Sequence, residues 1–415
     1  MMLSKKTIKD DAAKKNSKHN FYAFLWHAGF LALAKNFIDV DTIIPAMLIE
    51  SGGKAMHVGI MTAIMLGGAS FTQLFFAPYI SNKGFKKKYL LFEINSRILS
   101  LFSLGLILLC SCSRQSHVIL GLIFLFITVF SLGGAFTNIS YVDMLGKSIT
   151  EDKRKTFFST KQIITGSVML LSAFIAKKVL SFLDYPLNFA FMFFIGAFLL
   201  LIASGGFWKV KETANSAFKI YGVKDFFRKL KSELSENPAL VYFLGFINTQ
   251  GVIISFLPFV ILYSKETMNA QSSDTGYFLL YKVLGVISAS LLIFLVAKRI
   301  KYNSLLYLNT GLSFLMILFT FLVDDTHTLR YIFIIGGVVY SLYVITMNGL
   351  LLEISGRENR AIYTGFTGAG NILPAVFPLI GGWIILHWGF SIFFLLYMLI
   401  VSLSIFFIYK INCNK

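Results

Sequence analysis

The chain has 415 residues, of which 56% are hydrophobic and only 14% are charged. Soluble globular domains carry about a quarter charged residues, so this composition excludes an ordinary soluble protein and indicates that membrane lipids surround the chain. The formal net charge of +18 does not indicate a nucleic-acid partner, because the basic residues lie in short segments between apolar runs, which is a signal of membrane topology.

Apolar runs of about 20 residues, the length that an α-helix needs to cross a bilayer, recur along the chain. They predict twelve spans, near 21–48, 55–81, 89–112, 117–143, 158–183, 187–208, 238–264, 272–297, 303–323, 327–354, 361–386 and 388–410. The first run is too long for the core of a signal peptide, so we expect it to remain as the first span. The domains predicted from this pattern are a polar N-terminal tail (1–20), a six-helix bundle (21–208), a central loop (209–237) and a second six-helix bundle (238–410).

The positions of Lys and Arg predict the orientation of these spans. Of the 38 basic residues, 28 lie in segments on one side of the predicted membrane, six on the other side and four within spans. Because basic loops stay in the cytoplasm, we expect both termini to be cytoplasmic, in a multi-pass protein of the plasma (inner) membrane. In the central loop, Val223–Leu234 reads as a basic amphipathic helix, which lies either on the anionic inner leaflet or in solvent as a linker.

The two halves share spaced patterns, which indicate an internal repeat. At an offset of 213 residues, Phe30, Leu31 and Pro45 match Phe243, Leu244 and Pro258. At an offset of 210, Asp143 and Gly146 match Glu353 and Gly356. At an offset of 217, Gly59 and Gly68 match Gly276 and Gly285. Three matches at a nearly constant offset favour two six-helix repeats in the same orientation. The predicted fold class is therefore an all-α membrane protein with twelve transmembrane helices in two repeats.

The turn after the second span, Ala77–Lys88, is basic and contains Gly84 and Lys87. With six plus six spans and a basic central loop, the chain resembles the major facilitator superfamily over essentially its whole length. In the family motif at this turn, Gly84 and the lysines fit, whereas Ala77, Ser81 and Asn82 replace a Gly, an Asp and an Arg, so no subfamily is assigned. The resemblance implies a monomeric secondary transporter that moves a small-molecule substrate by alternating access with a proton or sodium ion, and that uses no cofactor.

Charged residues inside spans cost about 2.5–3.5 kcal/mol on insertion scales, so each one needs a role. Lys35 and Asp39 lie four residues apart in the first span and can pair on one helix face. Such a pair either fixes the packing of the helix or lines a cavity and exchanges a proton. We expect Asp41, two residues further on, to point elsewhere, toward the outer mouth. Lys282, in the eighth span, either pairs across the bundle with Asp39 or Asp41 or receives an anionic group of the substrate. Two lysines at mid-depth favour a substrate with a carboxylate or a phosphate.

Further candidates follow from the predicted spans. Uncharged polar residues in spans that line the cavity of the resembling family are candidate substrate contacts, with helix–helix hydrogen bonding as the alternative: Asn138, Tyr141, Asn248, Gln250, Tyr281, Asn348 and Asn371. Residues at the predicted inner ends of spans are candidates for a cytoplasmic gate, with plain solvated ion pairs as the alternative: Glu93, Arg97, Asp143, Glu353, Gly84 and Lys87.

Enzymatic motifs do not occur in the sequence. It has no His-x-x-x-His, Gly-x-Ser-x-Gly or Walker loop, and its three cysteines and six histidines show no metal-site spacing, so we expect neither an enzyme nor a metal site. The function predicted is ion-coupled symport of a small anionic metabolite, with the proton as the favoured coupling ion. The alternatives are a proton-coupled exporter of hydrophobic compounds and a receptor without transport activity built on the same fold.

Overall fold

The computed structural model describes residues 2–81, 84–110, 117–149, 151–212, 223–296, 300, 302–355, 363, 366–368 and 370–411. Within these ranges all regular structure is helical, and nine segments are long and apolar enough to cross a membrane by length and composition. The prediction of an all-α chain with many apolar spans is confirmed, while the number twelve stays a prediction.

The described part of the first half contains seven α-helices and one short 3-10 helix. They are α1 (Met2–Lys35), η1 (Asn36–Ile38), α2 (Ile43–Glu50), α3 (Ala55–Ser81), α4 (Lys87–Cys110), α5 (His117–Ser148), α6 (Glu151–Phe182) and α7 (Leu187–Lys209). The predicted first span is therefore not one continuous helix, because α1 ends at Lys35 and α2 begins at Ile43. This break places two carboxylates at the interface between the bundles.

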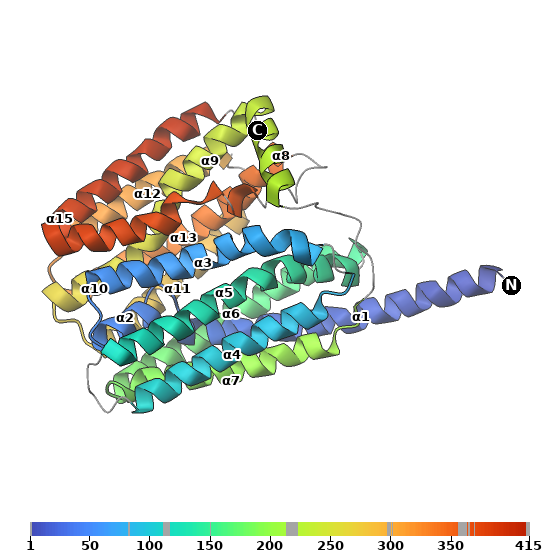
Figure 1. Ribbon diagram of the computed structural model, residues 1–415, viewed down its shortest axis with the longest axis horizontal. Coiled ribbons are helices and arrows are strands. Elements are labelled where there is room, and N and C mark those ends of the chain that lie inside the picture. Colours follow the sequence, from blue (N-terminus) through green and yellow to red (C-terminus); the bar gives the residue numbers. More distant parts are fainter. Residues whose placement is uncertain are drawn as a thin grey trace.

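The second half repeats this plan with its own interruptions. Its described elements are α8 (Val223–Glu236), α9 (Pro238–Gln250), η2 (Gly251–Ser255), α10 (Phe256–Thr267), α11 (Ser272–Val296), α12 (Tyr302–Leu322), α13 (Thr326–Ser355) and α15 (Leu373–Lys410). Gly389 interrupts α15 with a φ of 79°, a backbone conformation that glycine adopts at no steric cost. At this point the chain reverses, so α15 runs to one end of the molecule and back (Figure 1).

Figure 1 shows the two halves side by side, with the N-terminus and the C-terminus at the same end of the molecule. The matched glycines make equivalent contacts in the two halves. A Cβ on Gly59 of α3 would collide with the Pro378 carbonyl oxygen of α15, and a Cβ on its match Gly276 of α11 would lie 3.0 Å from the Lys177 Cα of α6. Small residues let helix backbones approach closely where no larger side chain fits. The repeat seen in the sequence therefore corresponds to two equivalent contacts between the bundles.

The helix predicted in the central loop is present as α8, but part of its apolar side covers protein. Leu230 and Leu234 pack against the buried cluster of the second bundle, and the Tyr363 hydroxyl donates a 2.6 Å hydrogen bond to Glu233. Phe227 remains 46% exposed. Neither of the two expected alternatives, a helix on the inner leaflet or a solvated linker, describes the two leucines, because they cover protein.

Candidate substrate and coupling site

The break in the first span is formed by the Asp39 side chain. Its Oδ1 accepts hydrogen bonds from the backbone N–H groups of Asp41 (3.1 Å) and Thr42 (2.9 Å) and from the Thr42 hydroxyl (2.9 Å). A short carboxylate that binds backbone N–H groups a few residues ahead competes with a continuous helix and favours a turn. The local sequence thus ends one helix and starts the next, and it turns both carboxylates toward the second bundle.

Lys282 of α11 completes this group from the second bundle. Its Nζ lies 2.6 Å from Asp39 Oδ2 and 2.5 Å from Asp41 Oδ2, and the three side chains are only 8%, 16% and 13% exposed. Of the two roles expected for Lys282, the structure shows the pairing across the bundles. We call Lys282, Asp39 and Asp41 the interbundle triad.

The two carboxylates of the interbundle triad are held differently. Asp39 accepts hydrogen bonds from three donors of its own turn in addition to Lys282, whereas Lys282 is the only described partner of the Asp41 carboxylate. Hydrogen bonds to a carboxylate stabilise its charged form. The triad carries two negative charges against one positive charge, so Asp41 is the group better placed to accept a proton. Asp41 also lines a cavity of about 10 Å³ together with Tyr340, whose side chain is 39% exposed.

Lys35 does not form the predicted pair with Asp39. The α-helix changes to the 3-10 helix η1 directly after Lys35, and Asp39 has an extended backbone conformation. The spacing of four residues therefore does not place both side chains on one helix face. Lys35 makes no hydrogen bond or ion pair with the residues that the structure describes, and its side chain is exposed although Ala34 and Asn36 beside it are buried. Lys35 is therefore a cation without an ion-pair partner among the described residues, next to the interbundle triad.

Two further cations lie near Lys35. Lys161 of α6 and Arg97 of α4 are close enough for their positive charges to act on Lys35 and on the buried His27. Lys161 Nζ lies 5.4 Å from the centre of the Tyr141 ring, and Arg97 stacks on Phe130 at 4.2 Å. The first bundle therefore presents a group of positive charges beside the interbundle triad.

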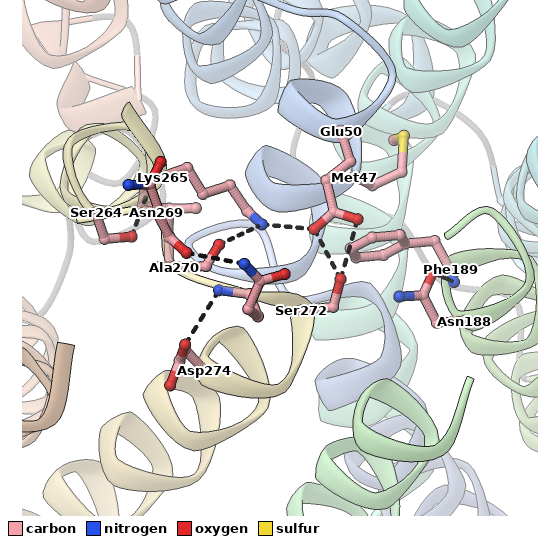
Figure 2. Close-up of polar contacts among 12 residues, drawn as sticks. Met47, Glu50, Asn188, Phe189, Ser264, Lys265, Asn269, Ala270, Ser272 and Asp274 are labelled. Atoms are coloured by element: carbon pink, nitrogen blue, oxygen red, sulfur yellow. Dashed lines mark hydrogen bonds and ion pairs between the residues drawn. The ribbon is translucent and has the colours of Figure 1, made fainter. Parts of the chain in front are cut away.

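At the end of the molecule opposite the termini, a second ion pair joins the bundles. Lys265 of α10 donates a 2.5 Å hydrogen bond to Glu50, the last residue of α2, and the Ser272 hydroxyl binds both oxygens of Glu50 at 2.8 and 3.0 Å. Figure 2 shows Glu50 between these two donors. We call Glu50, Lys265 and Ser272 the closing contact, because it spans the gap between the bundles at this end.

An aromatic contact closes the same end. The Tyr277 ring of α11 lies between the Lys177 ammonium of the first bundle, 3.7 Å from its centre, and the Arg330 guanidinium, at 4.0 Å. Arg330 is in turn bound to Asp274 at 2.8 Å. The hydrogen bonds, ion pairs and cation–π contact named above between the bundles lie at the interbundle triad or nearer to this end.

The chain is similar to known proteins in sequence and in fold. The sequence model described as Major Facilitator Superfamily matches residues 25–371. The chain belongs to the major facilitator superfamily. A protein of Geobacillus stearothermophilus described as "Uncharacterized protein in sodM 3'region" is 31% identical over 190 residues, which cover 43% of this chain and 86% of that protein.

Solved structures with the same fold agree with this assignment to the superfamily. A mutant form of the nucleoside transporter NupG superimposes with a TM-score of 0.70 at 13% identity, over 95% of this chain and 100% of that chain. The D-xylose-proton symporter gives a TM-score of 0.67 at 13% identity, over 94% of this chain and 97% of that chain. At these identities the likeness shows the fold alone. Family and fold identify a transporter rather than an enzyme, as predicted.

Two of the predicted substrate contacts form hydrogen bonds within the protein. Gln250 is fully buried, donates to the Ser313 hydroxyl at 2.8 Å and accepts hydrogen bonds from Thr310 and Ser404. Asn248 donates a hydrogen bond to the Gly370 carbonyl and accepts hydrogen bonds from the backbone N–H groups of Ile372 and Leu373. It thus provides hydrogen-bond partners for the backbone at the start of α15. For these two residues the structure shows the hydrogen bonding between helices that the sequence offered as the alternative.

The other predicted contacts are placed less uniformly. Tyr281 packs edge-on against Tyr331, the exposed Asn348 binds back to its own helix, and Asn371 has a buried Oδ1 without a partner among the described residues. The Tyr141 hydroxyl is likewise buried without a described partner. The side chain of Asn138 lies outside the described residues.

The candidate cytoplasmic gate is described only in part. Glu93 is buried near Arg97 on the same helix, and Glu353 is partly exposed and engaged with a neighbour. The side chain of Asp143 lies outside the described residues. Lys87 instead binds the Trp208 and Val210 carbonyls, which satisfies the end of α7, and Gly84 has open space around it.

Sequence reasoning did not select the residues of the closing contact or Lys161. Glu50, Lys265 and Ser272 lie at the ends of spans, where charged and polar side chains look like ordinary loop residues. Lys161 was visible as a lysine inside an apolar span, and that signal was sufficient to select it.

Replacing Glu50 with Gln is expected to open this end of the superfamily transporter. The amide loses the ionic hydrogen bond to Lys265, worth about 1.5–3 kcal/mol, so the ratio of open to closed molecules should rise by at least about tenfold. Spin labels at the exposed positions Lys54 and Thr267, in a protein whose native cysteines are replaced by Ser, report the distance across this end. The exposed Glu266 provides a matched control, and an equal change in Glu266→Gln, or no change in Glu50→Gln, contradicts the role of the closing contact.

Proposed function

We propose that this transporter couples the movement of a small anionic solute to the uptake of a proton on Asp41. The observation that carries the proposal is the bridge of Lys282 between two carboxylates of the opposite bundle. A group of three charges with one negative charge in excess can take up one proton and become neutral. Because this group joins the two bundles, a proton on Asp41 weakens an ion pair at the interface that alternating access has to rearrange.

The anionic nature of the solute is supported by the cations of the first bundle. Lys35 and Lys161 have no acidic partner among the described residues, and Lys282 is already engaged by the interbundle triad. We therefore assign the substrate role to Lys35 instead of Lys282, and the proton-coupling role to Asp41 together with Lys282. Proton uptake on Asp41 removes a negative charge from the neighbourhood of Lys35, so proton and anion each favour binding of the other.

The orientation in the membrane is part of the same proposal. With both termini in the cytoplasm of a plasma-membrane protein, as the distribution of Lys and Arg predicts, the closing contact faces outward. The contacts described between the bundles then correspond to a state that is closed to the outside. An outward-facing state requires both the closing contact and the interbundle triad to rearrange.

Uptake into proteoliposomes tests the proposed function. We expect a panel of labelled anions, sugars and lipophilic cations to yield at least one anion whose uptake accelerates about tenfold or more when the outside is made more acidic than the lumen. Empty liposomes provide the control. Acceleration of lipophilic cations alone, in exchange for protons, would instead indicate an exporter of hydrophobic compounds, and no uptake of any compound would favour a receptor.

A further inference from the structure

We propose that Lys35 and Lys161, with the Tyr141 hydroxyl, bind a doubly charged oxyanion, such as a phosphate group or a pair of carboxylates. This inference rests on the proposed function and names the class of solute. The three side chains come from three helices of the first bundle, α1, α6 and α5. Neither lysine forms an ion pair with an acid in the part of the chain that the structure describes.

Accessibility distinguishes these lysines from the two lysines that form ion pairs between the bundles. Lys265 and Lys282 are each 8% exposed and bound to carboxylates, whereas Lys35 is exposed and Lys161 is half-buried. An ammonium group in a membrane protein needs water, an anion or a ligand around it. Lys35 and Lys161 are therefore free to receive a ligand from solution.

Tyr141 adds a specific donor beside these charges. Its ring lies 5.4 Å from Lys161 Nζ, and its hydroxyl is buried without a hydrogen-bond partner among the described residues. A buried hydroxyl without a partner costs free energy that a bound oxyanion can offset by accepting its hydrogen bond. A phenol donor and two ammonium groups together suit an oxyanion with several acceptor oxygens.

The balance of charge favours two negative charges on the ligand. Of the described groups that act on one another here, four are cations (Lys35, Arg97, Lys161 and Lys282) and three are acids (Asp39, Asp41 and Glu93). One positive charge is in excess, and a proton on Asp41 raises the excess to two. A dianion then leaves the group neutral, whereas a monoanion leaves one positive charge in excess.

Direct binding to the purified full-length protein in detergent tests this assignment without any transport. The probes are inorganic phosphate, succinate, acetate and glucose, and the measurement is isothermal titration calorimetry. We expect saturable binding of phosphate, succinate or both, and at least about tenfold weaker binding of acetate and glucose. Binding of phosphate alone identifies a phosphate-bearing solute, and binding of succinate alone identifies a dicarboxylate.

Variants locate the site. Lys35→Gln and Lys161→Gln should each weaken binding of the dianion at least about tenfold, Tyr141→Phe about three- to tenfold, and Lys161→Arg less than Lys161→Gln. Lys178→Gln, on an exposed lysine of the same helix as Lys161, is the matched control. Unfolding temperatures without ligand identify any variant that fails to fold, and Lys161→Arg keeps the test informative in that case.

Three results would overturn the assignment: no saturable binding of either dianion at millimolar concentration, acetate binding as tight as that of the dianions, or unchanged affinity in folded Lys35→Gln and Lys161→Gln. These outcomes are separate from failure of the proposed coupling. Dianion binding that depends on Lys161, in a protein that moves no protons, would retain the site and refute the coupling.

Discussion

Replacing Lys282 with Gln should lower the free energy of unfolding by about 3–5 kcal/mol, the usual cost of removing one partner of a buried ion pair. The variant leaves two largely buried carboxylates without their shared cation. Asp39 keeps the three donors of its own turn, whereas Asp41 keeps no described partner, so most of the cost falls on Asp41. Denaturant unfolding of the purified protein in detergent measures the loss.

Two further variants control this result. Lys282→Arg keeps the positive charge and should lose less stability than Lys282→Gln, although the planar guanidinium changes the geometry. Adding Asp41→Asn to Lys282→Gln removes the carboxylate that has no other partner and should restore most of the stability. Wild-type stability in Lys282→Gln, or no recovery in the double variant, is incompatible with Asp39 and Asp41 as the main partners of Lys282.

Replacing Asp41 with Asn should abolish uphill accumulation of the solute and reduce the accumulation ratio to about one. The amide keeps the size of the side chain but no longer binds and releases a proton. Exchange of labelled for unlabelled solute should continue, because exchange needs the solute site and no net proton movement. Uptake and exchange in proteoliposomes, driven by the same proton gradient, separate the two activities.

Asp39→Asn is the matched control for this prediction. It retains Asp41 and Lys282, and an amide oxygen can still accept the hydrogen bonds of the turn. We therefore expect reduced stability but continued uphill transport. Uphill transport that survives Asp41→Asn and disappears in Asp39→Asn would assign the coupling role to Asp39, one of the two alternatives that the sequence leaves open for it.

The partners of Lys282 could be anticipated from the sequence, because a lone lysine in an apolar span needs an acid and only few acids lie inside spans. The pairing of Lys35 with Asp39 was wrong for a local reason. It assumed a continuous helix, whereas the Asp39 side chain binds the N–H groups of the following turn and ends it. Hydrogen-bond competition of this kind is hard to see where an apolar pattern suggests one unbroken span.

The sequence also does not predict which residues of the two bundles meet at their interface. Gly59 and Gly276 were recognised as repeat matches, but only the structure shows that each meets a helix of the opposite bundle. The contact between Glu50 and Lys265, 215 residues apart, follows from how the two bundles are docked and has no local sequence signal. The sequence also does not predict the buried hydrogen bonds of Gln250, because a buried network and a substrate site use the same kind of side chain.

Recording proton and solute uptake together in proteoliposomes tests the coupling at Asp41 most directly. The solute is phosphate or succinate, whichever the purified protein binds, and a trapped pH-sensitive dye reports the lumen. With no initial pH gradient, an inward solute gradient should acidify the lumen in the wild type, whereas Asp41→Asn should exchange solute without acidification. Solute uptake by the wild type without acidification, or equal acidification by both proteins, would contradict proton-coupled anion transport through Asp41.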